Sequence, residues 1–387
     1  MLPAKRTAVT GLTSIACASA MALSLAGCIS QRSVEQTGCG PVEPQLRVPT
    51  LAPPRSEVNV LALSAGGPWG GFGVGVLNGW SQIEAPAERV RPTFDLAVGV
   101  STGATFVTHA FLGREFDTAM RDELFALSTK EVFRRRNLFA AILGNSVTDT
   151  TPLRRRMRKT ITPEVLDRVA DAWIHEGRRL AVIAVDMDCG DPELLDLTAV
   201  ALQRDRPDRV ERYIDYIMAS SASPVAFPPV FVDGRMLVDG ALRQHIPLPR
   251  QIATLLQGRE APGQQVRLHI LINSPLMTLP ACVTDNVLLI ALRTSDVWTG
   301  ERAVDGLALA VIDAEARGWS VRFVIPGAEA CMPAPPAEDY FRPDFMQCQF
   351  EHGRRLGSAP ADPWLAGLAG LPTPDEVDGA IRHPCRP

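Results

Sequence analysis

Short apolar runs that alternate with longer segments of helical character constrain the fold of this chain more than any other feature. Six runs have the length of buried strands: Val58–Leu63, Leu96–Val98, Leu180–Val185, Phe231–Val232 with Met236–Val238, Leu268–Ile272 and Val321–Ile325. Segments of helical character lie between them, at roughly 73–84, 103–113, 115–129, 163–176, 208–220 and 301–316. This alternation predicts an α/β fold of three layers, in which helices cover both faces of a mixed, mostly parallel central sheet.

The composition fits such a folded domain. Of the 387 residues, 46% are hydrophobic and 21% are charged, which is typical of globular proteins and not of disordered ones. The formal net charge of −4 argues against nucleic acid as the main partner. The sequence leaves the question of a protein partner open.

The N-terminus has the pattern of an export signal. Lys5 and Arg6 precede the uncharged stretch Ala8–Ala26, and small residues lead into Cys28. The sequence Leu-Ala-Gly-Cys that ends at Cys28 resembles the lipobox of bacterial lipoproteins. This resemblance implies that residues 1–27 are a signal peptide and that Cys28 is lipidated, which attaches the protein to the cell envelope. Ile29, in place of an Asp, favours the outer membrane, facing the periplasm or the surface. The alternative is an uncleaved membrane anchor.

The remaining chain divides by composition. Residues 28–57 are rich in proline and are predicted to be a tether, and residues 58–328 to be the folded domain. Residues 329–387 contain many prolines and three cysteines, which predicts a loop-rich, disulfide-braced tail packed on the domain.

Cysteine usage agrees with an oxidising compartment. Six cysteines remain after the signal peptide and Cys28: Cys39, Cys189, Cys282, Cys331, Cys348 and Cys385. Cys331 and Cys348 flank a proline-rich segment and are the predicted pair. For Cys189 and Cys282, disulfides and buried free thiols remain open alternatives. The spacings do not resemble a zinc site, and no metal or other cofactor is predicted.

A glycine-rich segment, Ser64–Gly75, follows the first predicted strand. Backbone N–H groups at such a turn into a helix can hold a phosphate or the oxyanion of an acyl transfer. The spacing fits neither of the common nucleotide-binding glycine motifs, which makes a nucleotide site the weaker interpretation.

A second glycine motif, Gly99-Val100-Ser101-Thr102-Gly103, follows the next predicted strand. A serine between glycines at a strand-to-helix turn is typical of a nucleophile on a sharp corner. Together with the preceding glycine loop, it predicts acyl transfer with Ser101 as nucleophile.

The base that activates Ser101 is not an obvious histidine. His109 follows by more than two helical turns, His269 alternates with apolar residues in a strand, and His245 lies in a loop. Asp233-Gly234 is predicted to be a two-residue hairpin turn. Asp239-Gly240 ends the next strand, where the Asp is either a partner of Ser101 or part of a second turn.

The order of these motifs resembles that of the patatin-like phospholipases. In that family a glycine-rich oxyanion loop, a Gly-x-Ser-x-Gly turn and an Asp-Gly-Gly or Asp-Gly-Ala follow one another along the chain. Here they correspond to Ala65–Gly70, Gly99–Gly103 and Asp239–Ala241, and the stretches that begin at Thr148 and Ala219 are also similar. The resemblance covers about residues 58–330.

The resemblance implies a lipid acyl hydrolase of the phospholipase A or esterase type, with a Ser–Asp dyad and no histidine. Ser101 would form the acyl-enzyme and Asp239 would be its base. A free Asp has a pKa of about 3.9, so burial must raise the pKa of Asp239 for this role. The amides of Gly66, Gly67 and Thr102 would hold the oxyanion, and the other motif glycines are Gly70, Gly99, Gly103 and Gly240.

The oxyanion loop departs from the family pattern at two positions. Ala65 replaces the first glycine, and Trp69 replaces a basic residue, which leaves the head-group preference and the catalytic rate open. A tryptophan here suits an acyl chain or a membrane interface.

Two further hypotheses remain. One is a catalytically weak or inactive lipid-binding envelope lipoprotein that keeps the fold. The other is a histidine-dependent hydrolase that uses Ser101, Asp239 and His269.

Basic, apolar and acidic clusters elsewhere in the sequence have more than one possible role. The basic runs Arg134–Arg136 and Arg154–Lys159 fit lipid head groups or a solvated helix face. The apolar residues from Phe133 to Leu143 fit a lid or ordinary core. Asp186-Met187-Asp188 is interpreted as polarity at a strand end.

Overall fold

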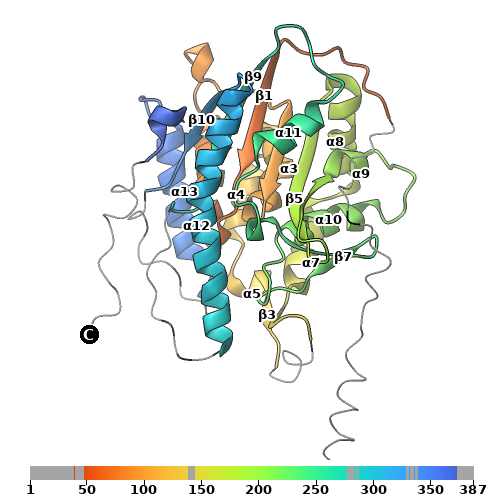
Figure 1. The fold of residues 1–387 in the computed structure, drawn as a ribbon, viewed down its shortest axis with the longest axis vertical. Helices are drawn as coiled ribbons and strands as arrows, with labels where there is room; N and C mark the ends of the chain where they lie inside the picture. Colours follow the sequence, from red (N-terminus) through yellow and green to blue (C-terminus); the bar gives the residue numbers. More distant parts are fainter. Residues whose placement is uncertain are drawn as a thin grey trace, which may run out of the picture. The chain divides into compact units, whose positions relative to one another are not determined.

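A mixed β-sheet forms the centre of the protein in the computed structural model (Figure 1). The structure describes residues 39, 48–137, 144–276, 283, 285, 287–327, 331, 335 and 339–372. All of them belong to one compact unit of the chain, Cys39–Pro387.

The strands of the sheet follow the order β11-β10-β9-β1-β2-β5-β8-β7, and β6 pairs with β5. Neighbours from β10 to β5 are parallel, and the remaining pairs are antiparallel. The parallel strands are β1 (Glu57–Leu63), β2 (Leu96–Val100), β5 (Arg179–Asp186), β9 (Gln265–Leu271) and β10 (Ser320–Val324). The antiparallel strands are β6 (Pro192–Asp196), β7 (Val230–Val232), β8 (Arg235–Asp239) and β11 (Leu365–Ala366). A separate pair consists of β3 (Arg134–Arg135) and β4 (Thr148–Asp149).

Helices cover both faces of the sheet. One apolar core is formed with α2 (Gly70–Trp80), α3 (Thr102–Leu112), α4 (Asp117–Phe125), α8 (Pro163–Glu176), α10 (Arg209–Ser220) and α13 (Pro343–Gly357). The other is formed with α11 (Pro249–Leu256) and α12 (Val287–Ala316), which lie in front of the sheet in Figure 1. The predicted three-layer α/β/α fold with a mostly parallel sheet is therefore confirmed.

Shorter helices connect these elements. The α-helical ones are α5 (Thr129–Val132), α7 (Thr151–Thr160) and α9 (Leu197–Ala201). Single 3₁₀ turns are η2 (Gly67–Trp69), η3 (Ala87–Arg89), η4 (Arg114–Phe116), η5 (Gly240–Leu242) and η7 (Leu368–Gly370). Of these turns, η2 lies within the glycine-rich segment and η5 directly follows Asp239.

The C-terminal tail contains a helix that the sequence did not predict. α13 packs on α2 so closely that a Cβ on Gly75 would lie 2.1 Å from the carbonyl oxygen of Phe350. Gly353 makes the reciprocal approach, 2.1 Å from the carbonyl oxygen of Phe72. The expectation of a loop-rich tail is therefore wrong for residues 343–357, because glycines on both helices let the two backbones touch. The predicted disulfide Cys331–Cys348 is confirmed.

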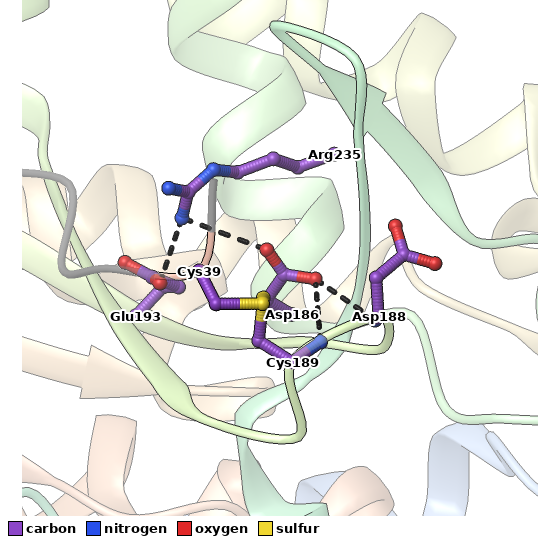
Figure 2. The surroundings of a disulfide bond; sticks show 6 residues. All are labelled: Cys39, Asp186, Asp188, Cys189, Glu193 and Arg235. Carbon is purple, nitrogen blue, oxygen red and sulfur yellow. Dashed lines mark hydrogen bonds and ion pairs between the residues drawn. A yellow bond between two sulfur atoms is a disulfide. The ribbon is translucent and has the colours of Figure 1, made fainter. Parts of the chain in front are cut away.

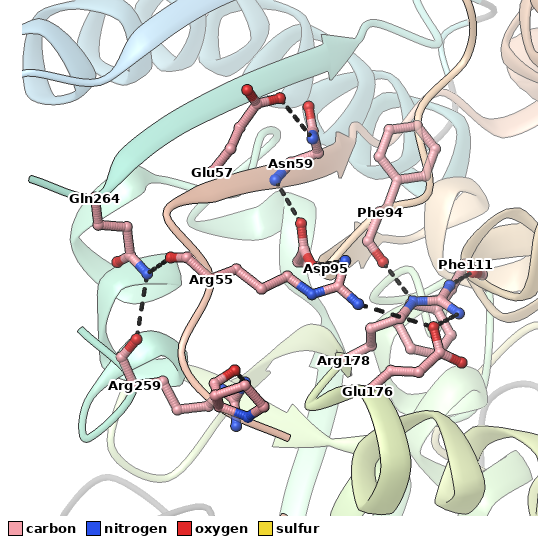
Figure 3. Close-up of polar contacts among 11 residues, drawn as sticks. Arg55, Glu57, Asn59, Phe94, Asp95, Phe111, Glu176, Arg178, Arg259 and Gln264 are labelled. Carbon is pink, nitrogen blue, oxygen red and sulfur yellow. Dashed lines mark hydrogen bonds and ion pairs between the residues drawn. The ribbon is translucent and has the colours of Figure 1, made fainter. Parts of the chain in front are cut away.

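The described part of the expected tether is attached to the domain. Val48 accepts a hydrogen bond from the indole of Trp173, and Arg55 forms an ion pair with Asp95. Figure 3 shows the polar contacts around Arg55 and Asp95. Cys39 is bonded to Cys189, which decides the open alternative for Cys189 in favour of a disulfide, whereas Cys282 lies outside the described residues.

Candidate active site

Ser101 occupies a sharp turn between β2 and α3. Its backbone has φ 52° and ψ −122°, a left-handed region that costs a non-glycine residue about 1–3 kcal/mol. The end of α10 holds this turn: the N–H of Ser101 donates to the carbonyl of Ser220 at 3.1 Å, and Ser221 Oγ donates to the carbonyl of Ser101 at 3.0 Å. The strain at Ser101 therefore persists because neighbouring groups fix the turn from both sides.

Strand register brings Asp239 to Ser101. β2 pairs with β5 as far as Val100, which is opposite Ile183. β8 pairs with β5 from the other direction, and Asp239 is opposite Ala184. Because β6 occupies the other side of β5, the ends of β2 and β8 meet on one side of it. Two residues 138 positions apart thus become direct neighbours.

The Asp239 carboxylate is held by two hydrogen bonds. Ser101 Oγ donates to Oδ2 at 2.6 Å, and the N–H of Ala241 donates to Oδ1 at 2.9 Å. Burial raises the pKa of Asp239 to about 7, against the smaller lowering effect of these two hydrogen bonds. The carboxylate can therefore accept a proton near neutral pH, as a base must.

Two motif glycines permit this approach of strand ends. A Cβ on Gly240 would lie 2.4 Å from the carbonyl oxygen of Ile183, and one on Gly103 would lie 2.6 Å from that of Leu63. A side chain at either position would push the ends of β8 or α3 away from the sheet. These glycines act through close backbone contact, and neither has a positive φ.

The glycine-rich loop lies on the first turn of α3. A Cβ on Gly70 would meet Thr102 Oγ1 at 2.6 Å, and Gly67 has a φ of 52° that favours glycine. Within the described part of the chain, no hydrogen bond is donated by the amides of Gly66, Gly67 or Thr102. The loop is fixed from behind by Asn273, whose Nδ2 donates to the carbonyl of Ser64 at 2.8 Å.

The C-terminal tail packs against the glycine-rich loop, a contact that the sequence did not predict. Trp69 is buried and meets Phe345 of α13 edge-on, with ring centroids 5.1 Å apart. A Cβ on Gly67 would lie 2.6 Å from the Tyr340 hydroxyl. The expectation that Trp69 faces an acyl chain or membrane is wrong, because α13 covers it. Only the proline and cysteine content near Cys331–Cys348 hinted that this tail packs on the domain.

Among the described residues, no histidine forms a hydrogen bond with Ser101 or Asp239. His269 Nδ1 accepts from Arg322 Nε at 2.8 Å and Nε2 contacts Asn59 Oδ1 at 3.2 Å, while His245 Nε2 contacts Ser274 Oγ. Burial lowers the pKa of His245 to about 4 and that of His269 well below its ordinary value. His269 therefore does not form a triad with Ser101 and Asp239, because both of its ring nitrogens have other partners.

The second basic run is partly paired with acids, through Arg154, Arg156 and Arg158. Arg154 and Arg158 contact Glu211, and Arg156 contacts Glu123 and Glu131, as a solvated helix face would. Arg134 and Arg135 are exposed on β3.

The remaining clusters have structural explanations where they are described. Asp186 Oδ1 accepts from the N–H of Asp188 at 2.9 Å, which caps the turn after β5 and agrees with strand-end polarity. Asp233 and Gly234 have φ of 50° and 81° between β7 and β8, which confirms the hairpin turn. Phe133 is buried, whereas residues 138–143 of the suggested lid lie outside the described residues.

In the described residues, no cluster of three or more potential metal ligands is found. Among the helices described, none combines the length and apolar character needed to cross a membrane.

Fold and site together define an α/β protein with a serine on a strand-to-helix turn, a carboxylate partner and a glycine-rich loop beside it. Residues 61–250, which contain all three motifs, match the family model described as Patatin-like phospholipase. The chain therefore carries a patatin-like phospholipase domain, and the resemblance seen in its motifs is confirmed. This family indicates a lipid acyl hydrolase and lipid as its class of substrate.

The structure of VipD from Legionella pneumophila has a TM-score of 0.35 and 12% sequence identity, over 81% of this chain and 68% of that chain. A likeness of this size says nothing about activity. No curated protein matches the chain.

Proposed function

We propose that this protein hydrolyses carboxylic esters of lipids through an acyl-enzyme on Ser101, with Asp239 as the only general base. The observation that carries the proposal is the 2.6 Å hydrogen bond from Ser101 Oγ to Asp239 Oδ2. It joins a nucleophile on a strained turn to a buried carboxylate whose pKa is raised to about 7. No metal or cofactor is needed for this chemistry.

The first half-reaction forms the acyl-enzyme. Asp239 takes the proton of Ser101 as Oγ attacks the ester carbonyl carbon, and the carbonyl oxygen becomes an oxyanion. The amides of Gly66, Gly67 and Thr102 hold this charge, since they lie at a glycine loop and a helix N-terminus. The tetrahedral intermediate then collapses, and Asp239 returns the proton to the leaving alcohol.

The second half-reaction uses water in place of Ser101. Asp239 takes a proton from the water, which attacks the acyl carbon and forms a second oxyanion at the same amides. Collapse breaks the bond to Ser101 Oγ, which regains the proton from Asp239, and the fatty acid leaves. One carboxylate thus serves as base and acid in both halves.

Phospholipids and related lipids are the proposed substrates, and the bacterial cell envelope is the proposed site of action. Lipidation of Cys28 would attach the chain to the outer membrane, since several acyl chains contribute about 0.8 kcal/mol per buried methylene.

The test compares the wild-type protein with Ser101→Ala and Asp239→Asn. A fragment beginning near Arg47 would lose Cys39 and leave Cys189 unpaired, so the protein must begin after Cys28 and keep Cys39. Substrates are a short-chain chromogenic ester and a phospholipid panel, with circular dichroism to verify folding. The proposal requires that wild type cleaves and that both folded variants lose activity by at least about 10³-fold.

A second candidate is a lipid-binding protein of low or no activity. The observation that favours it is Trp69, which stands where the family has a basic residue and is fixed against Phe345. If wild type is inert on every substrate and a fluorophosphonate does not label Ser101, this candidate replaces the hydrolase.

A further inference from the structure

The disulfide Cys39–Cys189 joins the N-terminal segment to the edge of the sheet that carries the dyad. Cys189 lies in the turn after β5, and Ser101 follows β2, which is parallel to β5. The carboxyl ends of parallel strands lie at one edge of a sheet. Figure 2 shows the disulfide beside Asp186, the last residue of β5, and Arg235, the first residue of β8.

The chain that follows Cys39 is attached at the opposite edge. Val48 contacts Trp173 near the end of α8. Arg55 pairs with Asp95, which directly precedes β2 (Figure 3). β5 has 8 residues, so the two edges are about 26 Å apart. Without the disulfide, the N-terminal segment would therefore leave the domain from the amino edge, away from Ser101.

The disulfide also shortens the length of chain between the lipid anchor at Cys28 and its first attachment to the domain. The segment from Cys28 to Cys39 can span at most roughly 40 Å when fully extended. From Cys28 to Val48 the corresponding limit is roughly 70 Å. When Cys28 is anchored in a bilayer, the disulfide shortens the segment that links the anchor to the domain. It also moves the attachment point of this segment to the active-site edge.

The carboxyl edge has the surface chemistry of a lipid contact. Met187, which follows β5, is 43% exposed, and Phe231 of β7 is 51% exposed. Their strands meet at β8, where Met236 is opposite Phe231 and its carbonyl accepts the N–H of Met187. Exposed apolar side chains in such a row suit insertion among lipid head groups.

Two further elements extend this surface. Trp298 of α12 is 49% exposed, and its indole donates to the carbonyl of Leu242, three residues after Asp239. Arg134 and Arg135 of β3 are exposed, and their strand is joined through Val147 to the loop after α10 that holds the Ser101 turn. Arginines beside apolar groups are complementary to an anionic bilayer.

We propose that the Cys39–Cys189 disulfide holds the active-site edge against the bilayer in which Cys28 is anchored, so that the protein acts on the lipids of its own membrane. The partner of this surface is that bilayer. The inference rests on the proposed hydrolase activity and lipidation, and its test reads orientation separately from activity.

The first experiment uses the full, lipidated chain reconstituted in anionic vesicles. Cis activity is lipid hydrolysis in the vesicles that carry the protein, and trans activity is hydrolysis in added vesicles without it. The test variant is Cys39→Ser with Cys189→Ser. A second variant keeps the disulfide and adds about twenty Gly/Ser residues between Val34 and Glu35. The matched control is Cys331→Ser with Cys348→Ser, which removes a disulfide and leaves the tether unchanged.

Wild type should favour cis over trans lipids, and the ratio should fall at least about fivefold in the Cys39/Cys189 variant and in the linker variant. Hydrolysis of a soluble short-chain ester by the Cys39/Cys189 variant should stay within about twofold of wild type. The control should keep the wild-type ratio. An unchanged ratio in the Cys39/Cys189 variant would overturn the inference.

The second experiment needs no activity. In a Ser101→Ala background, vesicles contain a photoactivatable phospholipid, and labelled peptides are identified by mass spectrometry. Labels should concentrate on peptides that contain Met187, Phe231 and Trp298, and should spread to the peptide around Arg55 when Cys39 and Cys189 are replaced. Equal labelling of both edges with the disulfide intact would refute the proposal that the disulfide holds the active-site edge against the bilayer. If wild type does not hydrolyse esters but the labels still concentrate on the active-site edge, the hydrolase proposal is refuted and the proposed orientation by the disulfide remains supported.

Discussion

Asp239→Asn should change the pH dependence of stability as well as abolish activity. The wild-type carboxyl is buried, and its pKa is raised to about 7 from 3.8. An asparagine has nearly the same shape and is neutral at every pH. Its oxygen can accept from the N–H of Ala241, and its NH₂ can donate to Ser101 Oγ, so both hydrogen bonds survive.

The direction in which the free energy of unfolding changes with pH follows from proton binding to Asp239. Between about pH 4 and 7 the folded protein holds a proton on Asp239 that the unfolded chain has released. The free energy of unfolding therefore falls as pH rises through this window, by about 1.4 kcal/mol per pH unit. Over the whole window the loss is about 4 kcal/mol, and about half of it falls between pH 5 and 7. Asp239→Asn does not suffer this loss, so its stability relative to wild type should rise by about that amount.

Denaturant unfolding of both proteins at pH 5, 6, 7 and 8 measures the difference, because other titrating groups cancel. Asp233→Asn is the matched control, since Arg212 lowers the pKa of Asp233 and moves its titration below this range. The contribution of Asp233 is present above its unfolded pKa and is lost only as pH falls further, so the control should be flat. A difference for Asp239→Asn that stays constant within about 0.5 kcal/mol from pH 5 to 8 would refute a raised pKa.

Three other predictions concern the site and its support. The kcat/KM of wild type on a soluble ester should rise with pH to a plateau with an apparent pKa near 7, because Asp239 must be ionised, and a pH-independent rate from pH 5 to 8 would contradict this. His269→Gln should keep kcat/KM within about threefold, and a loss of about 10³-fold would restore the histidine-dependent hypothesis. Gly75→Ala should destabilise the fold by about 2 kcal/mol or more in thermal or denaturant unfolding, because its Cβ would lie 2.1 Å from the Phe350 carbonyl; the control Gly306→Ala, whose nearest neighbour would be 3.8 Å away, should stabilise α12 by up to about 1 kcal/mol.

Local pattern was enough for most strands of the sheet and for most of the helices on one face, but it missed β6, which pairs with β5, and the short strands β3, β4 and β11. The runs at Val58–Leu63 and Leu180–Val185 correspond to β1 and β5, because completely buried strands are written as continuous apolar residues. Residues 163–176 were predicted with the bounds that α8 has, since a Thr cap, an initial proline and a terminal glycine mark both ends.

Other helices lacked such marks. α7 has five basic residues in its ten positions, and only Pro152, Leu153 and Met157 of it are buried, so its apolar stripe is narrow. α12 begins at Val287, whereas the sequence predicted 301–316. α13 contains two glycines, Gly353 and Gly357, that lower helix propensity; contact with α2 outweighs this cost.

The sequence by itself determined the α/β class, the chain order of the motifs, and the two residues that carry the candidate chemistry. Strand periodicity and glycine turns are local, and they pointed to Ser101 at the turn after a strand. Asp239 was assigned through the resemblance to the patatin-like phospholipases, because spacing alone left it as a partner of Ser101 or part of a second turn. Only the tertiary structure decided that β2 and β8 meet end to end on β5, that Trp69 lies under α13, and that Cys39 bonds to Cys189. These are contacts between distant segments, fixed by register and by close backbone approach, and a one-dimensional pattern does not encode which pairs will touch.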